Sequence, residues 1–376
     1  MKSLKSLSSA PTLYDSILYL AARPPQVCSR CFSISALRSA TAWPITATGP
    51  PPPPPSASPS QYGERVERRR RQADLLKQAS SARSSAQSTR SLKKRFWKDV
   101  TIQSSEDGYI VYLDTRPVRN PLTKPAQPLL IPTSKPNFAT AIALEWDLLT
   151  SASDALRSHL IPLTSLASRA QILATEDAQA AAEGHLLKGE GTRYEIINTL
   201  LRYLDTDTLL CWAPEGRTES GDDTALRERQ IEVSKPILSY LTQKLWPSVE
   251  LVPTLSDGSI LPRSQPASTR AVVKGWMAGL PAWELVGLER ATLASKSLCV
   301  AARLIGEWSE ALNLGEGAPN GQGRFGIEEA ARACSLELQW QTAMWGEVED
   351  SHDVEKEDLR RQLGSVILLV GGVKGT

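Results

Sequence analysis

Histidine and cysteine are scarce in this sequence, which limits catalytic and metal-binding chemistry. The chain has three histidines in 376 residues, and none stands beside the Ser or Cys motif of a nucleophilic enzyme. Of its five cysteines only Cys28 and Cys31 lie close together, so no second pair completes a four-ligand zinc site. We therefore predict reduced thiols, no bound metal and no catalytic residues.

Phosphate-binding motifs and long apolar runs are also missing. No G-x-G-x-x-G or G-x-S-x-G motif follows an expected strand, and in the final "GGVKGT" Lys374 precedes Gly375 instead of a Ser or Thr that opens a helix. The longest late apolar run, residues 366–370, is far short of the roughly 20 residues that span a bilayer. The sequence predicts no cofactor and no stable insertion into a membrane.

Neither sign of charge dominates the whole chain. Its 43 Lys and Arg residues nearly balance 41 Asp and Glu, which disfavours a dedicated nucleic-acid binder. Basic residues outnumber acidic ones locally, from Glu64 to Lys98, where Arg68–Arg71 form an unbroken run that could hold nucleic acid or anionic lipid. A solvated tail or a short charged helix is favoured, because no aromatic residues interleave with these charges until Phe96 and Trp97. With six consecutive prolines at 50–55, we predict a disordered Pro/Ser/Arg-rich linker over 33–92.

Acidic residues are nearly missing from the first segment. Between residues 1 and 61 Asp15 is the one acidic side chain, among scattered Lys and Arg and many Ser, Ala and Leu. This composition is typical of a mitochondrial transit peptide, whose positive amphipathic helix responds to the import receptors and the membrane potential. The run Arg30-Cys31-Phe32-Ser33 has the form of a matrix-processing site, with cleavage expected after Phe32. We predict a transit peptide over 1–32, with a disordered tail as the alternative.

Folded structure is predicted to begin at residue 93 with a small α+β domain over 93–190. "FWKDVTIQS" and "GYIVYLDTRPV", separated by "SEDG", favour a β-hairpin, and 129–131 is a possible third strand. Helical patterns follow, after Pro136 and over 161–182. Residues 191–376 are predicted to form an all-α helical bundle. Apolar residues recur there at steps of three and four over 226–246, 284–294, 297–312, 327–345 and 354–370.

Two groups of polar residues are candidates for chemistry or binding. Asp205 and Asp207 could be paired carboxylates for acid–base work or for a divalent ion, but Asp and Thr also end helices and cap the next element, which we favour. Helical geometry puts Glu337, Gln341 and Trp345 on one line at i, i+4 and i+8. These five residues are the candidate site.

Glu337 is expected to be half-buried at the edge of an apolar seam. One role is an ion pair to a neighbouring helix, and the other is to anchor a partner, because a half-buried carboxylate beside Trp accepts a charge-assisted bond from an incoming Arg or Lys. A rival interpretation makes Glu337, with Asp205, Asp207 and His352, the site of a metal-dependent or acid–base enzyme. The seam is expected from Ile327, Ala331, Cys334 and Leu338.

Several motifs together resemble one family, the mitochondrial assembly chaperones for the alpha subunit of the F(1) sector of ATP synthase. They occur in the order of the family from about residue 93 to the end. One departure is Asn120, where the family usually has Thr before Pro121. The motifs are "RFWKDV" at 95–100, "GYIVYLDTRPVRNP" at 108–121, "EW" at 145–146, "PLT" at 162–164, "YLDTDTLLCWA" at 203–213, Gln230 with the following "PIL", and "LELQWQTAMWGEVEDSHDVEKEDL" at 336–359.

The resemblance implies a noncatalytic chaperone of the mitochondrial matrix. Such a protein binds the free alpha subunit of F(1)-ATPase, covers the surface later buried against beta, and prevents aggregation until assembly. The family has a smaller mixed N-terminal domain and an all-helical C-terminal domain, and its important acidic position falls on Glu337. We therefore expect a protein that is monomeric when free, binds the alpha subunit and no nucleic acid, and needs no cofactor.

Overall fold

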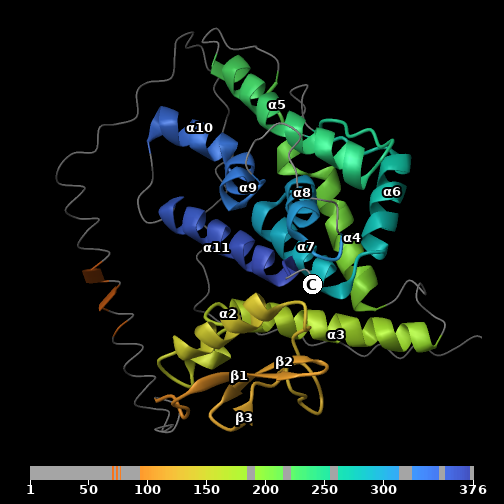
Figure 1. Cartoon of the computed structure of the whole chain (residues 1–376). Helices are drawn as coiled ribbons and strands as arrows, with labels where there is room; N and C mark the ends of the chain where they lie inside the picture. Colours follow the sequence, from red (N-terminus) through yellow and green to blue (C-terminus); the bar gives the residue numbers. More distant parts are fainter. Residues whose placement is uncertain are drawn as a thin grey trace, which may run out of the picture. The chain divides into compact units, whose positions relative to one another are not determined.

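The computed structural model describes residues 94–183, 191–214, 222–254, 261–312, 324–346 and 352–372, with five positions between 70 and 77. Contacts within the chain make Ser84–Thr376 one compact unit, in which a small antiparallel sheet is followed by helices (Figure 1). The predicted class, mixed α and β with mostly helical structure, is confirmed. The transit peptide and the linker lie almost wholly outside the described residues and stay predictions, as does the domain boundary at 190/191.

The predicted β-hairpin is confirmed. Strands β1 (Val100–Ser105) and β2 (Gly108–Leu113) pair antiparallel, with Ser105 opposite Gly108 across the turn. Val111 and Leu113 are buried on the face of β2 that alternation predicts. Gly108 is required at the turn, because its φ is 150° and a Cβ there would collide with the carbonyl oxygen of Ile131.

The third strand lies elsewhere than predicted. Strand β3 is Arg116–Pro117, which pairs with β2. Residues 129–131 are not a strand: Ile131 forms an isolated bridge to Tyr109, and the Leu129 N–H donates to the Val118 carbonyl at 2.9 Å. Two prolines bracket this segment, Pro128 and Pro132, and neither has an N–H to continue a ladder. The prediction of a strand over 129–131 is therefore wrong.

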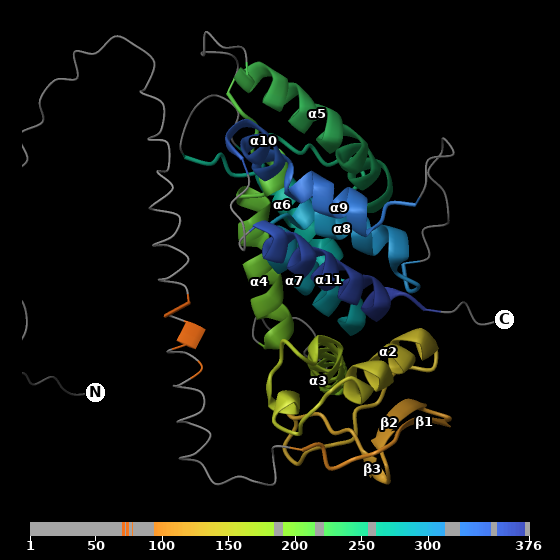
Figure 2. The same cartoon turned by 90° about the vertical axis from the view of Figure 1, so that its left-hand side faces the viewer.

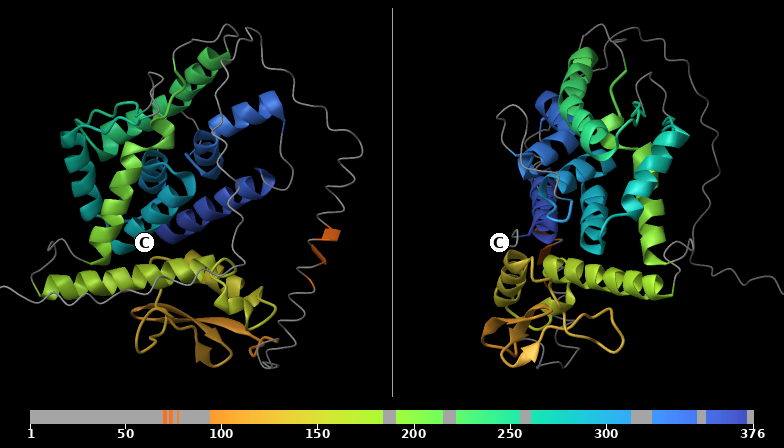
Figure 3. Two further views of the ribbon diagram at one scale, coloured as in Figure 1. Left: turned by 180° about the vertical axis from the view of Figure 1, so that it is seen from behind. Right: turned by 45° about the vertical axis from the view of Figure 1, so that its right-hand side comes forward.

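Helices α2 (Pro136–Asp147) and α3 (Pro162–Ala182) lie between the sheet and the later helices, as the view from behind in Figure 3 shows. The carboxylate of Glu145 connects α2 to α3. Glu145 accepts hydrogen bonds from the N–H of Leu163 at 2.8 Å and from the N–H and hydroxyl of Thr164 at 3.0 and 2.6 Å. It therefore caps the free N–H groups at the start of α3, although burial raises the pKa of Glu145.

The C-terminal half is helical, with its core at α7 and α8. Nine of the 14 residues of α7 and nine of the 11 residues of α8 are buried, and α11 packs along α7. Helices α4 and α6 were not predicted. A π-helical turn over Leu241–Leu245 continues α5, and two short 3-10 helices are η1 (Asp154–Leu156) and η2 (Thr208–Leu210). The helices are α4 (Thr192–Asp205), α5 (Asp222–Tyr240), α6 (Ala267–Ala278), α7 (Ala282–Ser295), α8 (Leu298–Trp308), α9 (Ile327–Cys334), α10 (Leu336–Trp345) and α11 (His352–Val370).

The helix predicted over 327–345 is two helices. It breaks at Ser335, whose backbone has φ −107° and ψ 12° and whose hydroxyl donates to the Ala331 carbonyl at 2.7 Å. A serine hydroxyl that bonds the preceding turn competes with the backbone and bends the helix. Helix α10 therefore leaves the line of α9 and contacts mainly α5 and α9. Its residues do not continue the seam that α9 begins.

Candidate partner-binding surface

Helix α10 carries three of the five predicted site residues on its exposed surface. Trp345 is 80% exposed and Glu337 is exposed, while Gln341 is half-buried. The Gln341 amide donates to the Glu337 carboxylate at 3.2 Å, as expected of residues at i and i+4. The prediction that Glu337 is half-buried at an apolar seam is wrong, because the break at Ser335 turns α10 away from the core.

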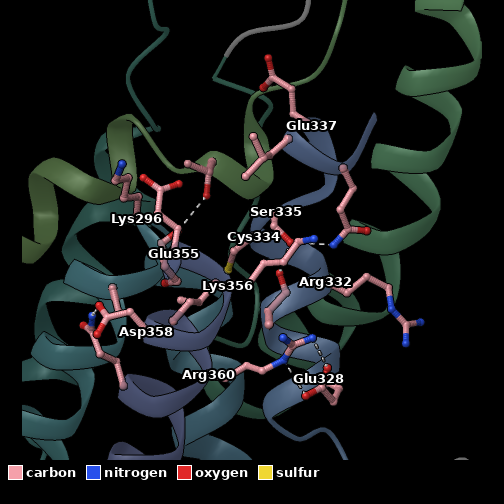
Figure 4. Close-up of a pocket in the computed structure, with 18 of the residues that line it drawn as sticks. Lys296, Glu328, Arg332, Cys334, Ser335, Glu337, Glu355, Lys356, Asp358 and Arg360 are labelled. Atoms are coloured by element: carbon pink, nitrogen blue, oxygen red, sulfur yellow. Dashed lines mark hydrogen bonds and ion pairs between the residues drawn. The ribbon is translucent and has the colours of Figure 1, made fainter. Parts of the chain in front are cut away.

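A groove of about 610 Å³ separates α9 and α10 from α11. Figure 4 shows Glu337 at one end of this groove and the ion pair of Arg360 with Glu328 at the other, with Cys334 between them. That pair, with N–O distances of 2.9 and 3.1 Å, connects α11 to α9. Charged side chains of both signs line the walls: Lys296, Glu328, Arg332, Glu337, Glu355, Lys356, Asp358 and Arg360.

Asp207 is buried and directly precedes Thr208, one of the residues that line this groove. Its carboxylate accepts hydrogen bonds from the Ser297 hydroxyl at 2.5 Å, the Cys299 N–H at 2.8 Å and the Leu209 N–H at 3.0 Å. It thus caps η2 and the N-terminus of α8 together, which confirms the structural interpretation of this residue. With no exposed surface, Asp207 cannot contact a partner of the folded chain, and its place in the predicted binding set is wrong.

Asp205 also serves the fold. Its carboxylate forms an ion pair with Arg270 of α6 and accepts a hydrogen bond from the Gln265 N–H at 3.1 Å. These contacts attach the end of α4 to the segment that leads into α6. Asp205 and Asp207 therefore point to different partners and do not form a pair of carboxylates.

The described part of the groove offers neither a thiolate nor a metal-binding cluster. Burial raises the pKa of the Cys334 thiol to about 12, so this side chain is not a thiolate at neutral pH. Among the described residues no group of three His, Cys, Asp or Glu side chains could hold a metal ion. Nor is any helix within the described ranges long and apolar enough to cross a membrane. The remaining acidic residues of the motif, Glu347, Glu349 and Asp350, and the side chains of His352 and Asp353 lie outside the description.

Several residues of this surface were not singled out from the sequence. Trp340 lies beneath the guanidinium of Arg229 on α5, 5.1 Å from ring centre to carbon, and Met344 is 50% exposed beside Trp345. The α11 wall was missed as well, since no sequence pattern says which helix packs across from α10. The two tryptophans of "LELQWQTAMW" were a signal of a binding surface, because a helix that faces only water does not require large aromatic side chains.

Comparisons with known proteins identify the family. Residues 94–242 match the profile described as ATP12 chaperone protein. Over 277 residues the chain is 31% identical to "Protein atp12, mitochondrial" of Schizosaccharomyces pombe, covering 73% of this chain and 81% of that protein. The chain belongs to the ATP12 chaperone family. The ATP12 protein of Saccharomyces cerevisiae is also 31% identical, over 274 residues that cover 72% of this chain and 81% of the relative.

A solved ATP12 structure has the same fold. The crystal structure of Atp12 from Paracoccus denitrificans aligns with a TM-score of 0.51 at 20% identity, covering 74% of this chain and 97% of that chain. A mutant of the same protein aligns equally well, with a TM-score of 0.51. Membership of the ATP12 family makes the chain a mitochondrial chaperone of ATP synthase assembly and not an enzyme. The rival enzyme interpretation is therefore wrong.

Proposed function

We propose that this ATP12 chaperone binds the unassembled alpha subunit of F(1)-ATPase in the mitochondrial matrix, through α10 and the groove beside it. The observation that carries the proposal is the exposure of Trp345, 80%, on a helix that also exposes Met344 and Glu337. A stable monomeric protein rarely leaves large apolar side chains together in water unless they meet a partner. The free chain is proposed to be monomeric and to need neither nucleic acid nor a cofactor.

The chemistry of α10 suits a client that still exposes an assembly interface. Tryptophan and methionine are enriched in the cores of protein interfaces, where a large side chain fills a pocket of the partner. Glu337 adds a carboxylate whose one described hydrogen bond, to Gln341, is a weak constraint. An Arg or Lys of the client would form a charge-assisted bond with it, stronger once water is excluded. Glu337, Gln341 and Trp345 are therefore the proposed contacts.

Asp205 and Asp207 are proposed to support client binding indirectly, by holding neighbouring elements in place. Asp207 holds Ser297 and Cys299 at the start of α8, and Thr208, next along the chain, lines the groove. The sheet-bearing residues 93–190 and the helical residues 191–376 are proposed to act as the two domains of the family. In that arrangement the proposed contacts on α10 belong to the helical domain.

A substitution of Glu337 tests the proposal. Glu337→Gln keeps the size of the side chain and removes its charge, so the melting temperature should stay nearly unchanged, because substitutions of exposed residues usually change stability by less than about 0.5 kcal/mol. Affinity for the purified alpha subunit should fall by about 2 kcal/mol or more, around thirtyfold, if Glu337 meets a desolvated cation. Titration calorimetry measures the affinity, and an aggregation assay with refolding alpha subunit measures the protection.

Glu106→Gln is the matched control. Glu106 is an exposed carboxylate in the turn between β1 and β2, at the far end of the sheet-bearing part, and should bind the client like the parent. Equal affinity of the Glu337 and Glu106 variants would show that Glu337 is no anchor. A parent that fails to bind the alpha subunit at all would overturn the proposed client.

A further inference from the structure

A second group of apolar side chains is exposed in a segment that is distant from α10 in the sequence. Four leucines between residues 144 and 160 face solvent, and no other stretch of this length in the described residues exposes as many large apolar side chains. Leu144 and Leu148 are one turn apart at the end of α2, and the others follow in η1 and in the turn before α3. This leucine corner comprises Leu144, 57% exposed, Leu148, 70%, Leu156, 79%, and Leu160, 37%.

The backbone beneath the leucine corner is firmly held. Asp154 accepts hydrogen bonds from the Thr150 hydroxyl and the Ser151 N–H, each at 3.0 Å. Hydrogen bonding from the side chains of Ser151 and Thr150 holds the pKa of Asp154 below its usual value. Glu145 ties the end of α2 to the start of α3 at the other side of the loop. The leucines are therefore exposed by an ordered segment, and a fixed apolar surface in water is typical of a binding site.

Helix α11 connects the leucine corner to the groove. Arg361 donates one hydrogen bond to the His159 carbonyl at 3.3 Å, next to Leu160, and another to the Asp358 carboxylate at 2.6 Å. Asp358 lines the groove. Figure 2 shows α10, α11 and the beginning of α3 toward the viewer on one side of the folded unit. The leucine corner and α10 thus lie on the same side of the folded unit, with α11 between them.

We propose that the leucine corner is a second docking surface for the client that α10 binds, and that its occupant is an apolar area of the same unassembled subunit. This inference rests on the proposed function. A stable protein interface covers about 800 Å² and 20–30 residues on each partner. Helix α10 has 10 residues, and the groove beside it is lined by charged side chains of both signs, so together they offer only part of the apolar area that the core of an interface requires. The leucine corner, which Arg361 connects to α11, supplies further apolar area.

The test uses the full chain with two leucines replaced. Leu148→Ser with Leu156→Ser removes the two most exposed leucines of the corner, so the melting temperature should stay within a degree or two of the parent. Affinity for purified alpha subunit, measured by titration calorimetry, should fall about tenfold or more. The matched control is Leu122→Ser with Val272→Ser, whose side chains are 58% and 42% exposed away from the corner. The control should bind like the parent.

The outcomes separate this inference from the proposed function. If the parent does not bind the alpha subunit, both are overturned together. If Glu337→Gln weakens binding and the leucine variant binds like the parent, the proposed function stands and the inference is wrong. Sedimentation velocity tests whether a second copy of the chain occupies the corner instead. If the parent is a dimer and the leucine variant is a monomer with unchanged client affinity, the corner is a dimer interface and the inference is overturned.

Discussion

At the scale of single residues, Asp207 binds three separate donors through one carboxylate. Its oxygens accept only, from one hydroxyl and two backbone N–H groups, and it has no exposed surface. Burial raises the pKa of Asp207, and the hydrogen bonds from Ser297, Cys299 and Leu209 oppose this shift. The site therefore relies on hydrogen bonds to offset the cost of burying the carboxyl group, and an exact match of donors to acceptors matters.

We expect Asp207→Asn to destabilise the chain although it is nearly isosteric. The amide brings an NH₂ group to one of the two oxygen positions, so either the Leu209 or the Cys299 N–H loses its acceptor. One unsatisfied buried donor costs about 1–3 kcal/mol. Urea unfolding followed by circular dichroism measures this loss. A variant as stable as the parent would mean that the donors find water instead.

At the scale of elements, the approach of α7 to α11 depends on a missing side chain. Gly287 lies in the middle of α7, and a Cβ built on it would be 2.6 Å from a methyl group of Val370 and 3.3 Å from one of Ile305. Real Cβ atoms do not come as close as the first distance, so the two helices pack backbone against side chain at this point. The close packing sets where α11 runs and, through it, one wall of the groove.

We expect the Gly→Ala substitutions at Gly287 and Gly275 to change the free energy of unfolding in opposite directions. Gly287→Ala should destabilise by about 1–3 kcal/mol, because overpacking of a close-packed core forces its neighbours to shift. Gly275→Ala, in α6, meets no heavy atom within 4 Å and should stabilise by about 0.5–1 kcal/mol through helix propensity. Urea midpoints of both variants measure the difference. Stabilisation by both would show that α11 moves aside freely.

At the scale of the whole folded unit, one buried cation joins the sheet-bearing part to the helical part. Lys135, just before α2, donates to the Val370 carbonyl at the end of α11 at 3.2 Å and lies 3.9 Å from the Glu284 carboxylate of α7. Burial lowers the pKa of Lys135 and raises that of Glu284, while their mutual attraction opposes both shifts. The pair holds α2 against two helices of the other part.

We expect Lys135→Met to destabilise the unit far more than the double variant Lys135→Met with Glu284→Met. The single change leaves a buried carboxylate without its cation, which costs about 3–5 kcal/mol. The double change removes both charges and replaces them with side chains of similar volume, so most of the loss should be recovered. Denaturant unfolding of the parent, both single variants and the double variant completes the cycle. Equal losses for the single and double variants would exclude a coupled pair.

The elements that local spacing controls were predictable. The hairpin follows from alternation on either side of a turn, and α7, α8 and α11 follow from apolar steps of three and four. Helix α4 carries the same signal in Ile196, Leu200 and Leu204, all buried, so it was predictable from spacing although it was not predicted. The break at Ser335 was not predictable, since serine is tolerated inside helices and only packing decides whether its hydroxyl bonds the preceding turn.

The candidate site was predictable only in part. The predicted i, i+4, i+8 alignment of Glu337, Gln341 and Trp345 is present in the structure, because all three residues lie within one helix. Its far wall on α11 and the cation–π contact of Arg229 with Trp340 depend on which helices meet, and the spacing of residues along the chain carries no such information. The leucine corner was invisible for the same reason, since exposed leucines look like core leucines in a sequence.

Spacing and composition along the chain were enough to predict the hairpin, the helical character of the second half and the aromatic content of α10, and the ordered motifs carried the resemblance to the family. The accessibility of the acidic side chains depends on the folded chain, which buries Asp207 in the interior and leaves Glu337 in water. The physical reason is that neighbours along the chain set the face on which a side chain lies. Whether that face is covered depends on contacts between segments distant in sequence.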